Sequence, residues 1–273
     1  MARTILITGC SSGIGLDAAR TLRERGWRVL ASCRKEADCE RLRGEGLESP
    51  RIDYEDEASI AAGWAEAMEA CGGRLDALFN NGAYAIPGLL EDLPEAAMRA
   101  IFEANLIGWH AVTRRAVPAM RAAGAGRIVH CSSVLGFAAM PWRGAYVATK
   151  FALEGYADTL RLELRGTGVR VSLIQPGPIR TRFRANAQAQ FARWIDAERS
   201  PNRDEYGRLM ARYASDAPDR WELPPAAVTR ALIHAVEAPR PRARYPVTVP
   251  TRAAGILRRV LPTRALDWTL SRS

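Results

Sequence analysis

Short runs of apolar and β-branched residues alternate along the chain with longer stretches in which apolar residues recur every three or four positions. The short runs predict strands, because a strand that is buried on both faces reads as an almost continuous apolar segment. These predicted strands span residues 4–8, 28–32, 75–80, 127–133, 169–175 and 244–250. The longer stretches predict helices at 14–25, 59–70, 95–121 and 146–165.

The order of these elements predicts the fold class. Strand and helix alternate through the first two thirds of the chain, which implies an α/β domain with a parallel sheet covered on both faces. The 273 residues suffice for one large core and are too few for two, so we predict a single domain over 1–273. Its ligands are expected beyond the carboxyl ends of the strands.

Two late segments depart from this alternation, so we expect the core within about 3–182 and 226–250. Residues 182–225 are basic, rich in alanine and contain four prolines. They are a candidate substrate lid, although a tolerated surface insertion explains them equally well. Residues 251–273 mix apolar residues with five arginines. We expect this C-terminal extension to pack against its own domain or a sister subunit rather than to touch a membrane peripherally.

Charge is unevenly distributed. Residues 180–273 hold 18 arginines and 9 acidic residues, so this part of the chain accounts for the whole net charge of +9. We favour a solvated basic face over attraction to anionic lipid, an acidic acyl carrier or a phosphate-bearing substrate. No nucleic-acid recognition motif accompanies the arginines, so a nucleic-acid partner is not expected.

The cysteines and histidines argue against a disulfide framework or a metal site. Five cysteines occur without a CxxC pair, and the three histidines, His110, His130 and His234, are scattered. The first apolar run follows Met1 too closely for a signal peptide, and no later run is long enough for a membrane-spanning helix. We therefore expect a cytoplasmic protein with reduced thiols and no metal.

A glycine-rich loop joins the first predicted strand to the first predicted helix. It reads TGCSSGIG and contains Gly9, Ser11, Ser12, Gly13, Ile14 and Gly15. Glycines let the backbone approach a diphosphate, and the helix N-terminus offers oriented N–H groups. We predict that these six residues bind a dinucleotide.

The end of the second predicted strand indicates which dinucleotide. Many dinucleotide sites carry a carboxylate here for the adenosine ribose, but Arg34 and Lys35 stand in its place. An arginine can hold a 2′-phosphate through charge-assisted hydrogen bonds, which favours NADP(H) over NAD(H). The alternative is that both are ordinary surface charges.

Two further strand ends offer cofactor contacts. Asp53, at the end of an additional expected strand, would accept a hydrogen bond from the adenine amino group or cap the following turn. Asn80, Asn81 and Gly82 follow the strand at 75–80 and suit either backbone contact with the cofactor or locking of the turn.

A lysine stands out in a chain that has 37 arginines and only two lysines. Lys150 lies one helical turn after Tyr146, so both side chains project from the same helix face. A nearby ammonium lowers the pKa of a phenol, which would make Tyr146 a usable acid or base. The compact lysine head can also reach ribose hydroxyls.

Two other residues complete the candidate chemistry. Ser133, at the end of the strand at 127–133, can hydrogen-bond a substrate carbonyl, with Ser132 as a credible competitor. Asn105 lies in the middle of a predicted helix, where its propensity is unfavourable, so we expect it to hold a partner.

Taken together, these residues resemble the classical short-chain dehydrogenase/reductase family over about residues 3–182. The motifs occur in the family's order as Thr8-Gly9-x-x-x-Gly13-x-Gly15, Asn80-Asn81, Asn105, Ser133, Tyr146-x-x-x-Lys150 and Pro176-Gly177-x-x-x-Thr181. The resemblance implies a Rossmann-type doubly wound parallel sheet and a catalytic tetrad of Asn105, Ser133, Tyr146 and Lys150. It further implies that Pro176, Gly177, Ile179 and Thr181 bind the cofactor, the last two at the nicotinamide carboxamide.

The branch that the chain resembles most contains hydroxysteroid and retinol dehydrogenases and bacterial NADP-dependent aldehyde reductases. This chain departs from the family's motifs at two places. It has Gly82-Ala83 where Ala-Gly is usual, and Ser12 where the branch has a basic residue. The resemblance also suggests a homodimer or homotetramer packed through the helices at 95–121 and 146–165.

We therefore predict an NADP(H)-dependent enzyme that interconverts a small lipophilic carbonyl compound and its alcohol by hydride transfer. Tyr146 would protonate the forming alkoxide, Ser133 polarise the oxygen, Lys150 tune Tyr146 and hold the ribose, and Asn105 position a water. The alternatives are a reductase of 3-oxoacyl thioesters, a non-catalytic NADP(H) sensor, and an isomerase or dehydratase of the extended relatives.

Overall fold

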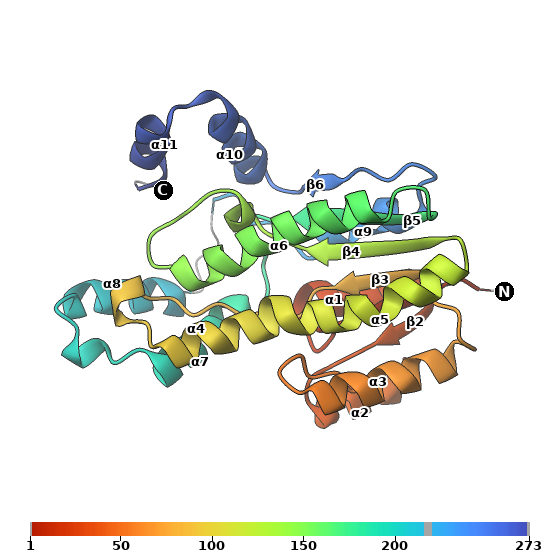
Figure 1. The fold of residues 1–273 in the computed structure, drawn as a ribbon. Helices are drawn as coiled ribbons and strands as arrows, with labels where there is room; N and C mark the ends of the chain where they lie inside the picture. Colours follow the sequence, from red (N-terminus) through yellow and green to blue (C-terminus); the bar gives the residue numbers. More distant parts are fainter. Residues whose placement is uncertain (1, 216–219, 272–273) are drawn as a thin grey trace.

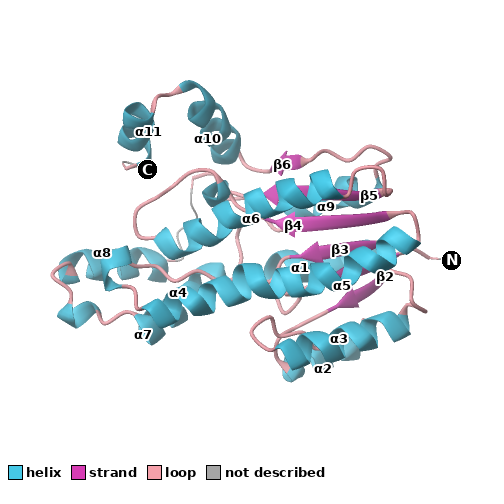
Figure 2. Cartoon of the chain, in the orientation of Figure 1, coloured by secondary structure: helices cyan, strands magenta, loops and turns pink. Residues whose placement is uncertain are grey.

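Six strands form one parallel sheet in the computed structural model, which describes residues 2–215 and 220–271. The strands are β1 (Thr4–Ile7), β2 (Arg28–Ala31), β3 (Ala77–Asn80), β4 (Gly126–Cys131), β5 (Val169–Gln175) and β6 (Arg244–Pro246). Their order is β2-β1-β3-β4-β5-β6, with the strand order reversing between β1 and β3. All arrows point the same way in Figure 2, so all carboxyl ends meet at one edge. The predicted α/β doubly wound sheet is confirmed.

Helices cover both faces of this sheet. In chain order they are α1 (Gly13–Glu24), α2 (Glu36–Gly44), α3 (Glu57–Ala70), α4 (Glu95–Phe102), α5 (Gly108–Ala122), α6 (Gly144–Glu163), α7 (Phe183–Trp194), α8 (Arg203–Ala214), α9 (Ala226–Glu237), α10 (Val249–Val260) and α11 (Thr263–Leu270). Helices α3, α5 and α6 lie in front of the sheet in Figure 1, and α1 and α9 lie behind it. Most strand residues are apolar and buried because both faces of the sheet are covered.

The structure differs from the sequence predictions in several details. The strand expected to end at Asp53 does not form; that segment makes only isolated β-bridges, from Glu48 to Leu30 in β2 and from Arg51 to Cys33 just after it. Helix α2 was not predicted, because its hydrophobic periodicity is weak. The strand expected at 244–250 is shorter, since Thr248 caps the start of α10.

The helix predicted at 95–121 is interrupted where it passes the site. Between α4 and α5 the residues Glu103–Ile107 form a π-helical segment, and Asn105 lies at its centre. A π segment inserts extra backbone into a helix and is frequent at functional sites. It changes the direction in which side chains leave the helix at this point.

A second apolar core lies beyond the carboxyl ends of the strands, where α7 and α8 extend from the sheet (Figure 1). Its buried members come from three separate segments: Tyr84, Ala85, Ile86, Ala97, Ile101 and Ala104, then Leu135, Ala145 and Tyr146, then Ala187, Ile195 and Tyr206. The candidate lid at 182–225 is therefore packed on the same core that holds Tyr146. Its residues 216–219 lie outside the described part of the chain.

In the described residues, none of the helices combines the length and the apolar character that crossing a bilayer requires.

Candidate active site

A cavity of about 1090 Å³ lies at the carboxyl ends of the strands. It brings together most of the predicted site residues: Gly9, Ser11, Ser12, Gly13, Ile14, Arg34, Lys35, Asp53, Asn81, Gly82, Ser133, Tyr146, Lys150, Pro176, Gly177, Ile179 and Thr181. Gly15, Asn80 and Asn105 do not line it. Residues from the sheet, from α6 and from the candidate lid thus share one hollow.

The glycine loop forms a tight cradle at one end of the cavity. Gly9 and Gly13 have positive φ angles of 69° and 58°, which favour glycine. A Cβ on Gly9 would approach Gly82 Cα to 2.5 Å, and one on Gly15 would approach the Gly9 carbonyl oxygen to 2.3 Å. Ser12 makes no capping hydrogen bond to α1, so it leaves the first-turn N–H groups to another acceptor. This loop fits the diphosphate of a dinucleotide.

Opposite charges meet where β2 ends. Arg34 and Lys35 are exposed and line the cavity, and Asp53 and Glu55 line the same end. Burial and the neighbouring Asp53 raise the pKa of Glu55, while the positive charge of Arg34 lowers it. The Asp53 carboxylate accepts a hydrogen bond from the Glu55 N–H at 3.2 Å. The site therefore offers a cation for a phosphate and a carboxylate for a hydroxyl or amino group.

Asn80 and Asn81 face different surroundings. The Asn80 side chain is fully buried and accepts a hydrogen bond from the Tyr54 hydroxyl at 3.0 Å, so it has no access to the cavity. Its amide also donates to Thr113 at 3.0 Å. Asn81 lines the cavity, and its amide donates to the carbonyl oxygens of Thr8 and Gly9 at 3.1 and 3.3 Å. Asn80 thus serves the fold, whereas Asn81 ties the β3 turn to the glycine loop.

The Asn105 side chain forms hydrogen bonds with Tyr84, as its unfavourable position within a helix led us to expect. Its Oδ1 accepts the Tyr84 N–H at 3.1 Å, and its Nδ2 donates to the Tyr84 carbonyl at 2.8 Å. The same Nδ2 lies 3.3 Å from Thr149 Oγ1, on α6. Asn105 is fully buried, so both of its amide hydrogens are used inside the protein. The structure gives these hydrogens no free position for a water.

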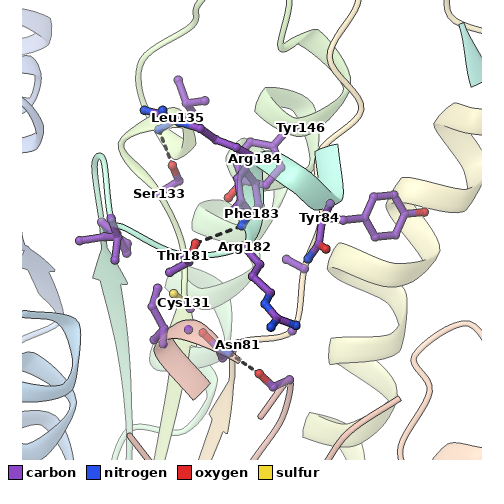
Figure 3. Close-up of a pocket in the computed structure, with 18 of the residues that line it drawn as sticks. Asn81, Tyr84, Cys131, Ser133, Leu135, Tyr146, Thr181, Arg182, Phe183 and Arg184 are labelled. Carbon is purple, nitrogen blue, oxygen red and sulfur yellow. Dashed lines mark hydrogen bonds between the residues drawn. The ribbon is translucent and has the colours of Figure 1, made fainter. Parts of the chain in front are cut away.

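Tyr146 lies in the first turn of α6 and packs against the start of the lid. Its ring meets the Phe183 ring edge-on, with centroids 5.4 Å apart (Figure 3). Burial raises the pKa of Tyr146 above its ordinary value, and a hydrogen bond with the Ser133 side chain opposes that shift. The phenol is therefore protonated at neutral pH.

The two neighbouring serines are used differently. Ser133 lines the cavity, and its Oγ accepts the Leu135 N–H at 3.1 Å (Figure 3). A hydroxyl that accepts from the backbone still has its own hydrogen to donate. The Ser132 hydroxyl donates to Glu154 Oε1 at 2.6 Å, which commits it to a buried carboxylate. Of the two candidates, the geometry favours Ser133.

Lys150 is held beneath Tyr146 by two contacts that sequence reasoning missed. Its Nζ donates to the Cys131 carbonyl at 2.8 Å and lies 4.3 Å from the centroid of the Trp109 ring. Its distance to the Tyr146 ring centroid is 5.5 Å. Burial lowers the pKa of Lys150 to about 8, against the nearby Cys131 and Glu154, which raise it. Lys150 thus carries its charge at neutral pH but loses it in mild alkali.

Trp109 connects Lys150 to the rest of the site. Its indole N–H donates to the Gly82 carbonyl at 2.8 Å, and its ring stacks on His130 at 5.9 Å. Burial lowers the pKa of His130 to about 3, so this neighbour is neutral and does not repel the lysine. No spacing motif connects positions 82, 109, 130 and 150, because only the fold brings them together.

The segment after β5 closes the cavity on the side of the glycine loop. The Thr181 methyl group faces Gly13, where a Cβ would come within 2.9 Å, and its hydroxyl accepts the Phe183 N–H at 3.2 Å. Ile179 bridges to Leu223 at the end of the candidate lid. Arg182, which was not predicted, also lines the cavity, and Figure 3 shows it pointing to the side that holds Asn81.

The other end of the cavity combines apolar side chains with the arginines Arg143, Arg184, Arg212 and Arg220. Its walls come from the loop after β4, the lid and the C-terminal extension, and they include Val134, Leu135, Ala138, Met140, Phe183, Trp221, Pro250, Ala254 and Leu270. Sequence reasoning did not identify these residues, because apolar side chains in a lid look like ordinary core residues.

Comparisons with known proteins agree with this geometry. The family model described as short chain dehydrogenase matches residues 3–191. The chain is 41% identical to "Uncharacterized oxidoreductase YbbO" of Escherichia coli (strain K12), over 99% of this chain and 94% of that protein. It is 34% identical to human "17-beta-hydroxysteroid dehydrogenase type 6", over 98% of this chain and 88% of that protein.

Solved structures show the same fold. A short chain dehydrogenase/reductase from Burkholderia phymatum in complex with NAD superposes with a TM-score of 0.80 at 26% identity, covering 98% of this chain and 95% of that one. An actinorhodin polyketide ketoreductase with NADPH gives a TM-score of 0.73 at 27% identity, covering 90% of this chain and 95% of that one. The predicted resemblance is confirmed, and the chain belongs to the short chain dehydrogenase family of oxidoreductases, which act on alcohol or carbonyl substrates.

Proposed function

We propose that this oxidoreductase uses NADP(H) to interconvert a lipophilic aldehyde or ketone and its alcohol, with Tyr146 as the proton donor and acceptor. The observation that carries the proposal is that Tyr146, Ser133 and Lys150 line one cavity whose far end presents many apolar side chains, with arginines of the lid among them. A carbonyl oxygen placed there would face two hydroxyl groups with a buried ammonium behind them.

The protein's part in the reaction is to handle the proton and the developing charge. When bound, NADP(H) supplies or accepts the hydride. The Ser133 oxygen accepts the Leu135 N–H, so its hydroxyl hydrogen can be donated to Tyr146 or, when a substrate is bound, to the substrate oxygen. Tyr146 is protonated at neutral pH, so it can deliver its proton to the oxygen as reduction proceeds. The Lys150 charge, 5.5 Å from the ring, then favours the phenolate that remains.

In this proposal Asn105 is a positioning residue. Its side chain fixes the main chain at Tyr84 and contacts Thr149, one residue before Lys150. The Thr149 hydroxyl in turn donates to the Tyr146 carbonyl at 2.8 Å. Asn105 therefore braces the turn of α6 that carries the tyrosine and the lysine. Because the Asn105 side chain is committed to Tyr84 and Thr149, a water that connects Lys150 to solvent would be held by the Asn105 main chain or by other groups.

The dinucleotide would lie between the glycine loop and the end of β2. The cradle at Gly9, Gly13 and Asn81 suits the diphosphate, and Arg182 adds a positive charge on the same side. Arg34 and Lys35 suit a 2′-phosphate, which only NADP(H) carries. Asp53 and Glu55 nearby could instead serve a free ribose, so the preference depends on Arg34.

Replacement of Arg34 tests the choice of cofactor. Loss of a charge-assisted hydrogen bond costs about 1.5–3 kcal/mol, so we expect Arg34→Ala to lower kcat/KM for NADPH by about 10- to 100-fold. Catalysis with NADH should change little, because NADH lacks the phosphate. Arg51→Ala is a control, since the Arg51 side chain lies next to Arg34 but donates to its carbonyl at 3.0 Å. Equal losses with both cofactors in Arg34→Ala would contradict the NADP(H) assignment.

The substrate class rests on the apolar wall and on the relatives. Two relatives are named as a retinol dehydrogenase and a 17-beta-hydroxysteroid dehydrogenase, and both names indicate lipophilic substrates. A second candidate is a 3-oxoacyl thioester, which the likeness to a polyketide ketoreductase favours. Lipophilic aldehydes, ketosteroids, retinal and an acetoacetyl thioester therefore form the test panel.

The deciding experiment measures consumption of NADPH and, separately, of NADH with each member of this panel. We expect turnover with NADPH on at least one lipophilic carbonyl compound. Turnover confined to the thioester would replace the proposed substrate class. Tight NADPH binding without turnover on any member would favour a sensor, and release of tightly held oxidised cofactor on denaturation would favour an isomerase or dehydratase.

We also propose a homodimer or homotetramer that packs through α5 and α6. Leu162 on α6 is 61% exposed, and Phe151 on the same helix is 36% exposed. Apolar side chains of this size at a helix surface are suited to a subunit contact. The cytoplasmic location stays a prediction.

A further inference from the structure

In contrast to the expectation from the sequence, we propose that α10 and α11 bind the surface of an anionic lipid bilayer and lie in its interface. Helix α10 carries an exposed apolar stripe in addition to its buried face. The stripe consists of Val249, Ala253, Ile256 and Val260, at intervals of four, three and four residues. Three of its members are between 56% and 66% exposed, whereas the buried face of the helix is formed around Thr251 and Ala254. A surface helix that packs only against its own domain needs a single apolar face.

Exposed arginines accompany the stripe. Arg252 and Arg259 stand on α10, and Arg264 stands on α11, one turn before Trp268, which is 60% exposed. Asp267 is the only acidic residue in the sequence from 249 to 273. Within residues 2–215 and 220–271, none of these three arginines forms an ion pair. Apolar, tryptophan and arginine side chains on one short helical hairpin match a helix that lies in a lipid interface.

The charge favours lipid over a second copy of this chain. A twofold contact between two α10 helices would place Arg252 and Arg259 of one copy against the same arginines of the other. Asp267 would be the single acidic residue of the hairpin available to offset them. An anionic bilayer supplies both an apolar layer for Ile256 and Val260 and negative headgroups for the arginines.

The position of the hairpin gives this contact a use. Helices α10 and α11 project beyond the β6 edge of the sheet (Figure 1). Their residues Pro250, Ala254 and Leu270 line the active-site cavity. A bilayer against the outer face of the hairpin would therefore lie one helix away from the apolar end of that cavity. Delivery of a lipophilic substrate from the bilayer rests on the proposed function, whereas the lipid contact itself does not.

Vesicle flotation of the full-length protein tests the contact without any turnover. We expect binding to vesicles of phosphatidylcholine with 30% phosphatidylglycerol, little binding to pure phosphatidylcholine, and weaker binding as salt rises. Arg252→Gln with Arg259→Gln should lower the partition coefficient on the order of 30-fold, at about fivefold for each arginine. Arg170→Gln with Arg230→Gln removes the same charge from exposed positions on β5 and α9 and should leave binding nearly unchanged.

Two more measurements keep the outcome clear. Ile256→Ser with Val260→Ser should lower the partition coefficient at least tenfold, because it removes the apolar insertion. Quenching of tryptophan fluorescence by brominated phosphatidylglycerol should occur in the parent protein and fall in Trp268→Phe. Absence of binding at low salt, or equal loss in both arginine pairs, would overturn the proposal. A change of oligomeric state in Ile256→Ser with Val260→Ser, without vesicle binding by the parent, would assign the stripe to a second copy instead.

Discussion

Tyr146 and Lys150 share the buried start of α6, and burial acts on both side chains by disfavouring their charged forms. It raises the pKa of Tyr146 and lowers the pKa of Lys150 to about 8. The sequence led us to expect that the lysine lowers the pKa of the tyrosine. The structure shows burial as the stronger influence on Tyr146, because the ammonium lies 5.5 Å from the ring and is held by the Cys131 carbonyl. Tyr146 is thereby kept in the protonated form that reduction requires.

The buried charge of Lys150 should cost stability, and the cost should depend on pH. Its pKa is lower in the folded protein than its ordinary value of 10.5, so the unfolded chain binds more protons between pH 8 and pH 10.5. The parent protein should therefore gain stability relative to Lys150→Met as pH rises through this window. At pH 7 we expect Lys150→Met to be more stable than the parent by up to about 3 kcal/mol, less the cost of the unpaired Cys131 carbonyl.

Urea unfolding at pH 7 and at pH 9.5 measures this difference. The stability advantage of Lys150→Met should shrink by about 2 kcal/mol between the two values. The change between the two pH values is the informative quantity, since the lost hydrogen bond to Cys131 costs the same at both. A constant difference would show that Lys150 is not a strained buried charge.

At the scale of elements, the candidate lid is attached to the site by a polar anchor inside the second apolar core. Tyr206 on α8 is 1% exposed, and its hydroxyl donates to Asp92 at 2.8 Å while accepting the Leu89 N–H at 3.0 Å. Its ring also packs against Trp142, just before α6. The lid is thereby connected to the helix that carries Tyr146.

Tyr206→Phe should loosen this attachment without touching the cavity. Removal of one buried hydroxyl with two partners should lower the free energy of unfolding by about 1–3 kcal/mol. We expect KM for the carbonyl substrate to rise severalfold, with a smaller change in kcat, because the lid forms a wall and not the proton path. Tyr156→Phe is the control, since its hydroxyl lies 3.1 Å from His110 Nδ1, and Tyr156 does not line the cavity. An equal rise in KM in both variants would argue against a specific anchor.

The sequence predicted elements best where one physical pattern dominated. The apolar runs of β1, β3, β4 and β5 mark buried strands, and their carboxyl ends place the cavity. The π segment at Glu103–Ile107 leaves no such clear pattern, because an extra residue shifts the phase of the apolar positions while the sequence on each side still reads as helix. The helices of the lid were also missed, since their short amphipathic faces pack on a core that the chain assembles from distant segments.

At the scale of the whole molecule, the site combines residues that motifs identify with residues that only folding brings near. The glycine loop, Tyr146 and Lys150 are recognisable from spacing because each set lies within one turn or helix. Trp109 and the Cys131 carbonyl are not, because they approach Lys150 from other elements, α5 and β4. Asn80 shows the converse, since a residue in a recognised motif turns into the core.

One measurement tests the central claim most directly: turnover of NADPH with an accepted carbonyl substrate in Tyr146→Phe, alongside NADPH binding by fluorescence. Removal of a general acid typically costs about 10²–10⁴-fold, and Tyr146→Phe should lose at least that much in kcat while its Kd for NADPH stays within about threefold of the parent. That result would support Tyr146 as the group that transfers the proton. A variant with kcat near that of the parent would contradict the account.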